Sequence, residues 1–230
     1  MICVGSASSN LPSRNVIMRP HTTSRPHRKH KRHGLAAALF SVIAAALASS
    51  ATAQETQLAL LPEPAFMRPD YVFPIAGTKA TILTLALVKG DDARELKKAD
   101  AERLKLDIDS ARRVAATNTS AVLAALKPDY VRDAHGVIQF AVLDSDSPAT
   151  ASAVLAPDFL DKFADIFGPD ILVAIPNRNR IYVYPALASK FQDTAEFVIR
   201  DYETSGSPVS KEIFRVTKDG LRAAGSFDVQ

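Results

Sequence analysis

The stretch ILVAIPNRNRIYVYP, Ile171 to Pro185, constrains the fold more than any other part of the sequence. Its first apolar run has no polar alternation, which is typical of a strand covered on both faces. After the polar Pro-Asn-Arg-Asn-Arg, a second run is expected to pair back as a hairpin, and Pro185 ends the ladder because proline has no N–H to donate. The sequence therefore predicts a hairpin at the centre of a covered sheet.

The other periodic segments surround this hairpin with a mixture of strands and helices. A β-rich run ends at Lys89-Gly90, and helical spacing with capping aspartates recurs further along the chain. We expect strands at Ala80–Val88, Tyr130–Arg132, Val137–Leu143, Ala151–Leu155, Ile213–Thr217 and Leu221–Phe227, and helices at Asp91–Leu104, Asp109–Leu126, Pro157–Phe167 and Leu187–Tyr202. Short connections and a lack of strict alternation predict one α+β domain over residues 80–230, a largely antiparallel sheet packed with helices.

Residues 1–53 are predicted to be a secretory signal peptide. A cationic block, His27 to Gly34, precedes a short apolar run, and Ala51 to Ala53 supply the small residues of a cleavage site. The alternative is a membrane anchor, but the strongly apolar part, Leu35 to Ala48, is shorter than the roughly 20 residues that cross a bilayer. Met18 is a second candidate for the start. We therefore expect an exported protein, periplasmic or extracellular, with no stable membrane insertion after cleavage.

Cleavage would change the charge and the chemistry of the chain. Seven of the 28 Lys and Arg lie in the leader, so the remainder carries 21 basic and 25 acidic side chains and a net charge of about −4. A net negative charge disfavours nucleic acid as a partner, because phosphate contacts need cations. The remainder has no cysteine and one histidine, His135. No disulfide can form, and stability must come from an apolar core.

Residues 54–79 are predicted to be a linker or an extended arm laid over the domain. Four prolines fall in this short span, and proline at that density excludes helix. An arm of this kind suggests a docking role in which it lies on another protein. The four are Pro62, Pro64, Pro69 and Pro74.

Most residue patterns of enzymes and cofactor proteins are missing. His135 stands beside Gly136 in a predicted turn, without the nucleophile context that a catalytic histidine needs. One histidine and no cysteine after residue 53 disfavour zinc, and neither a phosphate loop nor a dinucleotide fingerprint is present. We therefore expect no cofactor. A pair of Asp or Glu side chains across a cleft remains open, as in glycoside hydrolases.

The polar elbow of the central hairpin is the candidate binding site. Two guanidinium groups suit bidentate anion recognition, and two tyrosines offer a stacking face beside them. The alternative is a plain turn, because asparagine accepts a positive φ in turns and arginine keeps an elbow hydrated. The candidate residues are Asn177, Arg178, Asn179, Arg180, Tyr182 and Tyr184. Separately, Asn118 falls on the apolar stripe of its helix, where its amide is expected to tie the helix to a loop or a neighbouring strand.

Three stretches, ARRVAATNTSAVL, ATASAVLAPDFLDKFADI and FGPDILVAIPNRNRIYVYP, carry a family resemblance. They resemble the YtpQ-like group of bacterial proteins, which is defined by a domain of unknown function. This chain would be a distant member with an export signal, and it has Asn179 where the family usually has Asp. The resemblance implies a fold and no mechanism. It extends from Asp109 to Phe214, with matches at Ala115–Asn118, Ala151–Phe167, Gly168–Asn179 and Ser207–Ser210.

Together these patterns predict an exported envelope protein that is a binding module rather than an enzyme. Its expected ligand is an acidic small molecule, peptide or cell-wall fragment, held at the elbow by the two arginines. The alternatives are a carboxylate-dependent hydrolase of envelope glycan or peptide, and a structural or docking protein that uses the proline-rich arm.

Overall fold

The central hairpin is the middle of a six-stranded antiparallel sheet. The computed structural model describes residues 55–187 and 191–227. Its larger sheet has the order β10-β9-β7-β8-β6-β5, so the two predicted hairpin strands lie third and fourth, and this prediction is confirmed. The strands are β5 (Asp129–Arg132), β6 (Ile138–Asp144), β7 (Ile171–Asn177), β8 (Arg180–Pro185), β9 (Glu212–Thr217) and β10 (Gly220–Ser226).

A second, smaller sheet precedes it in the chain. In this sheet β3 (Thr81–Lys89) pairs antiparallel with β1 (Gln57–Pro64) on one side, and with β2 (Val72–Pro74) and β4 (Asp92–Glu95) on the other. A free linker is therefore ruled out for β1, which is an extended strand of the domain and is buried from Ala59 to Pro64. Its prolines fit because β1 is an edge strand.

Four α-helices and three short 3₁₀ helices complete the described part of the chain. They are α1 (Lys98–Leu104), α2 (Ile108–Ala125), α3 (Phe159–Phe167) and α4 (Ala195–Glu203), with η1 (Ala65–Met67), η2 (Thr150–Leu155) and η3 (Phe191–Thr194). The sheets and helices form a single α+β domain, as predicted, but it begins at β1 rather than at residue 80.

Three local predictions were wrong. The helix expected at Leu187–Tyr202 begins only at Ala195, after the 3₁₀ turn η3. The helix expected from Asp91 begins later, at Lys98, because Gly90 adopts a positive φ of 60° and turns the chain into β4. The strand expected at Ala151–Leu155 is η2 instead. There the Thr150 and Ser152 hydroxyls donate to carbonyls three residues back, which favours a tight helical turn over a strand.

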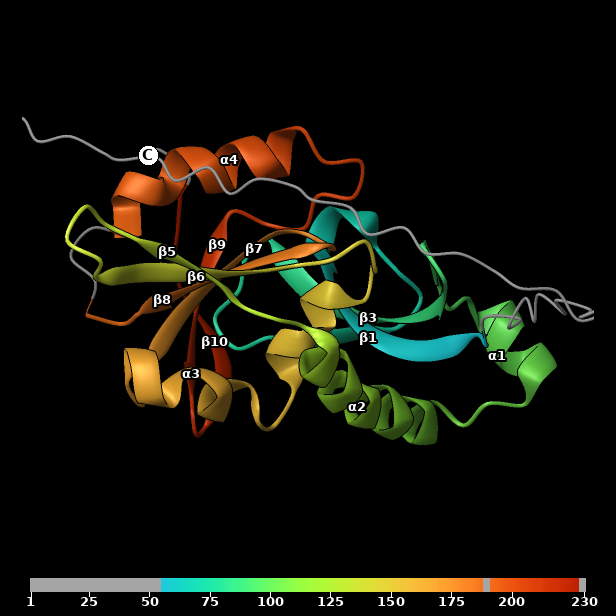
Figure 1. The fold of residues 1–230 in the computed structure, drawn as a ribbon. Helices are drawn as coiled ribbons and strands as arrows, with labels where there is room; N and C mark the ends of the chain where they lie inside the picture. Colours follow the sequence, from blue (N-terminus) through green and yellow to red (C-terminus); the bar gives the residue numbers. More distant parts are fainter. Residues whose placement is uncertain (1–54, 188–190, 228–230) are drawn as a thin grey trace, which may run out of the picture. The chain divides into compact units, whose positions relative to one another are not determined.

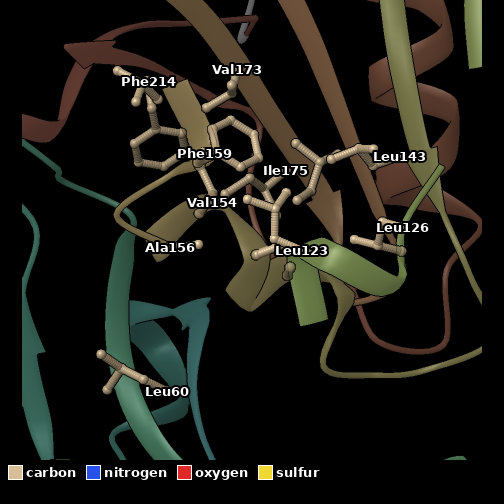
Figure 2. Close-up of a cluster of buried hydrophobic side chains, with 14 of the residues drawn as sticks. Leu60, Leu123, Leu126, Leu143, Val154, Ala156, Phe159, Val173, Ile175 and Phe214 are labelled. Carbon is tan, nitrogen blue, oxygen red and sulfur yellow. The ribbon is translucent and has the colours of Figure 1, made fainter. Parts of the chain in front are cut away.

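The larger sheet is covered on both faces, as its apolar hairpin predicted. Figure 1 shows α4 over one face and α3 on the opposite side. The main core lies on the α3 side and includes side chains of both sheets; Figure 2 shows Leu60 of β1 in the same view as Phe159, Ile175 and Phe214. This shared core joins the small sheet to the large one.

The predicted signal peptide, residues 1–53, and the candidate start at Met18 lie outside the described residues. Among the helices within residues 55–187 and 191–227, none combines the length and the apolar character that a bilayer span requires.

Candidate ligand-binding site

Backbone hydrogen bonds fix the elbow between β7 and β8 on two sides. The carbonyl of Arg178 accepts from the Ala151 N–H of η2, and the Arg178 N–H donates to the Ser207 carbonyl. Asn179 donates its side-chain amide to the Ser145 carbonyl at 3.0 Å. Asn177 accepts from the Asn179 N–H at 3.0 Å, but neither asparagine has the positive φ expected from the sequence. The elbow is therefore a built junction rather than a loosely solvated turn.

Arg178 points into the protein toward the small sheet. Its Nε donates to Glu63 Oε1 of β1 at 2.6 Å, and an Nη1 hydrogen bond reaches the Ala93 carbonyl of β4 at 3.2 Å. The side chains of Arg178 and Glu63 are 18% and 5% exposed. Burial raises the pKa of Glu63, and the hydrogen bond from Arg178 opposes this increase. Arg178 is thus a link between the sheets.

Arg180 lies between two carboxylates. Its Nε and Nη2 donate to Asp144 at 3.2 and 2.9 Å, and its Nη1 donates to Asp201 of α4 at 2.6 Å. The two acids differ in exposure, since the Asp144 side chain is 51% exposed and that of Asp201 is 10% exposed. The hydrogen bond to Asp144 and, after it, the bond to Asp201 raise the pKa of Arg180, so the guanidinium stays charged.

The two tyrosines are buried, so they do not offer the stacking face that the sequence suggested. Tyr182 and Tyr184 lie under α4 with their rings stacked 6.4 Å apart. The Tyr182 hydroxyl donates to Asp201 at 2.7 Å, and burial raises the pKa of Tyr182 to about 12. Tyr184 accepts from the Thr194 hydroxyl at 2.9 Å, and burial raises its pKa as well. Tyr182 thereby holds Asp201, which in turn holds Arg180.

A shallow hollow of about 230 Å³ opens at this point. Of the six predicted site residues, it brings together Asn177, Asn179 and Arg180, while Arg178 and the two tyrosines face elsewhere. Sequence reasoning missed the other lining residues because they come from β6 and from the end of α4. These are Asp144, Asp201, Thr204 and Ser205.

The alternative of a carboxylate pair has a candidate in Asp144 and Asp201. The Arg180 guanidinium hydrogen-bonds to both acids, so each carboxyl group already has a partner within the protein. Within the described ranges, no group of three His, Cys, Asp or Glu side chains is placed to hold a metal ion.

Two further sequence predictions can be located. Asn118 donates from Nδ2 to the Leu58 carbonyl of β1 at 2.8 Å, so the predicted tie to a neighbouring strand is confirmed. His135 is exposed in the turn between β5 and β6, and its backbone N–H donates to Asp133. Neither residue contributes to the hollow.

No family model, no curated protein and no solved structure matches this chain. The similarity to the YtpQ-like group therefore stays a prediction from the sequence.

Proposed function

We propose that this protein is an exported, non-catalytic binding module that recognises a carboxylate on a small molecule, peptide or cell-wall fragment. Arg180 is the residue that would contact this carboxylate. The supporting observation is the unequal exposure of its two acidic partners: Asp201 is nearly buried and Asp144 is half exposed.

Asp201 and Tyr182 hold the arginine from behind. Because both are buried, the Nη1 contact fixes the guanidinium before any ligand arrives. A fixed guanidinium loses little side-chain entropy on binding, and its planar fork matches a carboxylate through two N–H groups. Here the outward pair is Nε and Nη2, the same two atoms that Asp144 contacts.

Asp144 would be the replaceable partner. An exposed ion pair contributes only about 0–1 kcal/mol, so an incoming carboxylate can compete with it. Asp144 still lines the hollow after its side chain rotates away, so the charged lining residues Arg180, Asp144 and Asp201 sum to −1. Recognition of an anion therefore depends on the direct contact with the Arg180 fork and not on the net charge of the hollow.

The experiment uses N-acetyl-alanyl-alanine, which has one free carboxylate, and its C-terminal amide as the matched control ligand. We expect calorimetry to detect the acid and not the amide. Asp144→Asn should tighten binding of the acid by up to about fivefold, because it removes the competitor. Arg180→Gln should abolish binding without loss of folded signal in circular dichroism.

Arg215→Gln provides the matched control variant. Arg215 also donates to an aspartate, Asp170, through Nε at 2.8 Å and its side chain is half exposed, but it lies on β9 away from the hollow. The Arg215→Gln variant should bind N-acetyl-alanyl-alanine as tightly as the wild type does. The proposal fails if neither the wild type nor Asp144→Asn binds the acid, if the amide binds equally well, or if Arg180→Gln keeps its affinity.

The two alternatives have less support. A hydrolase at the elbow would have to use Asp144 and Asp201, which are both engaged by Arg180. The docking role relied on a free proline-rich arm, and the part of it from Ala59 to Pro64 is buried in the small sheet.

A further inference from the structure

A larger groove lies on another part of the domain. It has a volume of about 550 Å³ and runs between the η2–α3 segment on one side and the β9–β10 hairpin on the other. Cavities of a few hundred cubic ångströms are the usual size for small-molecule sites. None of the elbow residues lines this groove, so the inference drawn from it is independent of the proposed function.

The floor of the groove is apolar and rigid. Val154, Ala156 and Leu160 belong to the main core and are at most 7% exposed, and Figure 2 shows the first two within that core. Leu155 and Leu221 are partly exposed above them. Apolar side chains of a ligand would therefore rest on close-packed walls that need no rearrangement, and the area they cover would supply most of the affinity.

Two charged side chains face the groove from opposite walls. Asp161 comes from the first turn of α3, and Lys218 comes from the hairpin between β9 and β10. Both are exposed, and in the part of the chain that the structure describes neither is engaged in an ion pair. Opposite charges on the two walls, with apolar surface between them, suit a ligand with a cation at one end and an anion at the other.

We infer that this groove binds a short peptide with apolar side chains and free termini. Its ammonium group would meet Asp161, its carboxylate would meet Lys218, and its side chains would cover the leucines between. A purely anionic amphiphile is a poorer fit because Asp161 would repel it, and a purely cationic one would meet Lys218.

The test uses three ligands in the Arg180→Gln background, so that the elbow does not contribute. Leucyl-leucine has both termini free, N-acetyl-leucyl-leucine lacks the ammonium, and leucyl-leucine amide lacks the carboxylate. We expect the free dipeptide to bind most tightly, with each blocked form weaker by roughly fivefold, the size of one exposed ion pair.

Charge-removing variants then assign each end. Asp161→Asn should weaken the free dipeptide by a similar factor and leave the acetylated form unchanged. Lys218→Gln should weaken binding of the free dipeptide by the same factor and leave the affinity for leucyl-leucine amide unchanged. Arg132→Gln, an exposed arginine on β5, is the control and should change nothing.

The inference is overturned if leucyl-leucine does not bind, or if both blocked forms bind as tightly as the free dipeptide. It is also overturned if ultracentrifugation shows a dimer that Leu221→Asp dissociates, because a second copy of the chain would then cover the groove. None of these results affects binding of N-acetyl-alanyl-alanine at Arg180, so the two proposals fail separately.

Discussion

Arg178→Ala should be among the most destabilising single substitutions at the elbow. It removes the partner of Glu63, whose side chain is 5% exposed, and the donor to the Ala93 carbonyl. Breaking a buried ion pair by deleting one partner costs about 3–5 kcal/mol, because the remaining charge is left without compensation. For a domain of this size, that corresponds to a decrease in melting temperature of about 6–20 °C.

The assay is urea unfolding followed by far-ultraviolet circular dichroism, since the chain has no tryptophan. Arg215→Ala is the matched control. Its pairing with Asp170 is half exposed, so its removal should cost no more than about 1 kcal/mol.

A second substitution separates the buried charge from lost packing. In the Arg178→Ala background, Glu63→Gln replaces an uncompensated charge with a neutral amide, which is less costly to bury. We expect this double variant to recover part of the lost stability. If Arg178→Ala costs no more than Arg215→Ala, or if Glu63→Gln recovers nothing, the structural role assigned to Arg178 is wrong.

Two smaller predictions concern the partners of β1. Burial raises the pKa of Glu63 above 4.5. The wild type should therefore lose stability relative to Glu63→Gln as the pH rises from about 4.5 through the raised pKa, by at most about 1.4 kcal/mol per pH unit. If the stability of the wild type relative to Glu63→Gln instead increases with pH, the pairing with Arg178 outweighs desolvation. Asn118→Leu leaves the Leu58 carbonyl without its donor and should cost about 1–3 kcal/mol in urea unfolding, whereas Thr117→Ala on the exposed side of the same helix should stay within about 0.5 kcal/mol.

The fold was predictable where local pattern determines structure. The uninterrupted apolar run at Ile171 required cover on both faces, and the structure provides it with two separate cores. The tie from Asn118 was also predictable, because an amide on an apolar stripe needs a partner. Both arguments need only the chemistry of one segment, together with the rules that apolar side chains are buried and that buried polar groups are hydrogen-bonded.

The small sheet was not predictable in this way. Its β1 contains Pro62 and Pro64, which usually indicate a linker, and only the pairing with β3 shows that the segment is an edge strand. Edge position depends on what lies beside a strand, and local composition does not report it. Leu60 of β1 lies in the core that both sheets share. Its burial depends on how the two sheets pack, which the local sequence does not show.

Only three of the six predicted site residues line the hollow, because the partners that decide the role of each arginine lie far away in the sequence. Arg178 and Arg180 stand two residues apart in the same elbow and were given the same role from sequence. The acids that distinguish them are distant: Glu63 precedes Arg178 by 115 residues, and Asp201 follows Arg180 by 21. No spacing rule connects residues so far apart in a mixed sheet.

The same chemistry therefore gives two different roles at one turn, and burial of the partner decides between them. The Arg178 guanidinium is paired with Glu63, whose side chain is 5% exposed. Arg178 cannot exchange that partner without separating the two sheets. A guanidinium paired outward with Asp144, 51% exposed, can exchange it at the cost of a weak surface contact. Because Asp201 keeps Arg180 in place during that exchange, the geometry favours Arg180 for ligand recognition and assigns Arg178 to the scaffold.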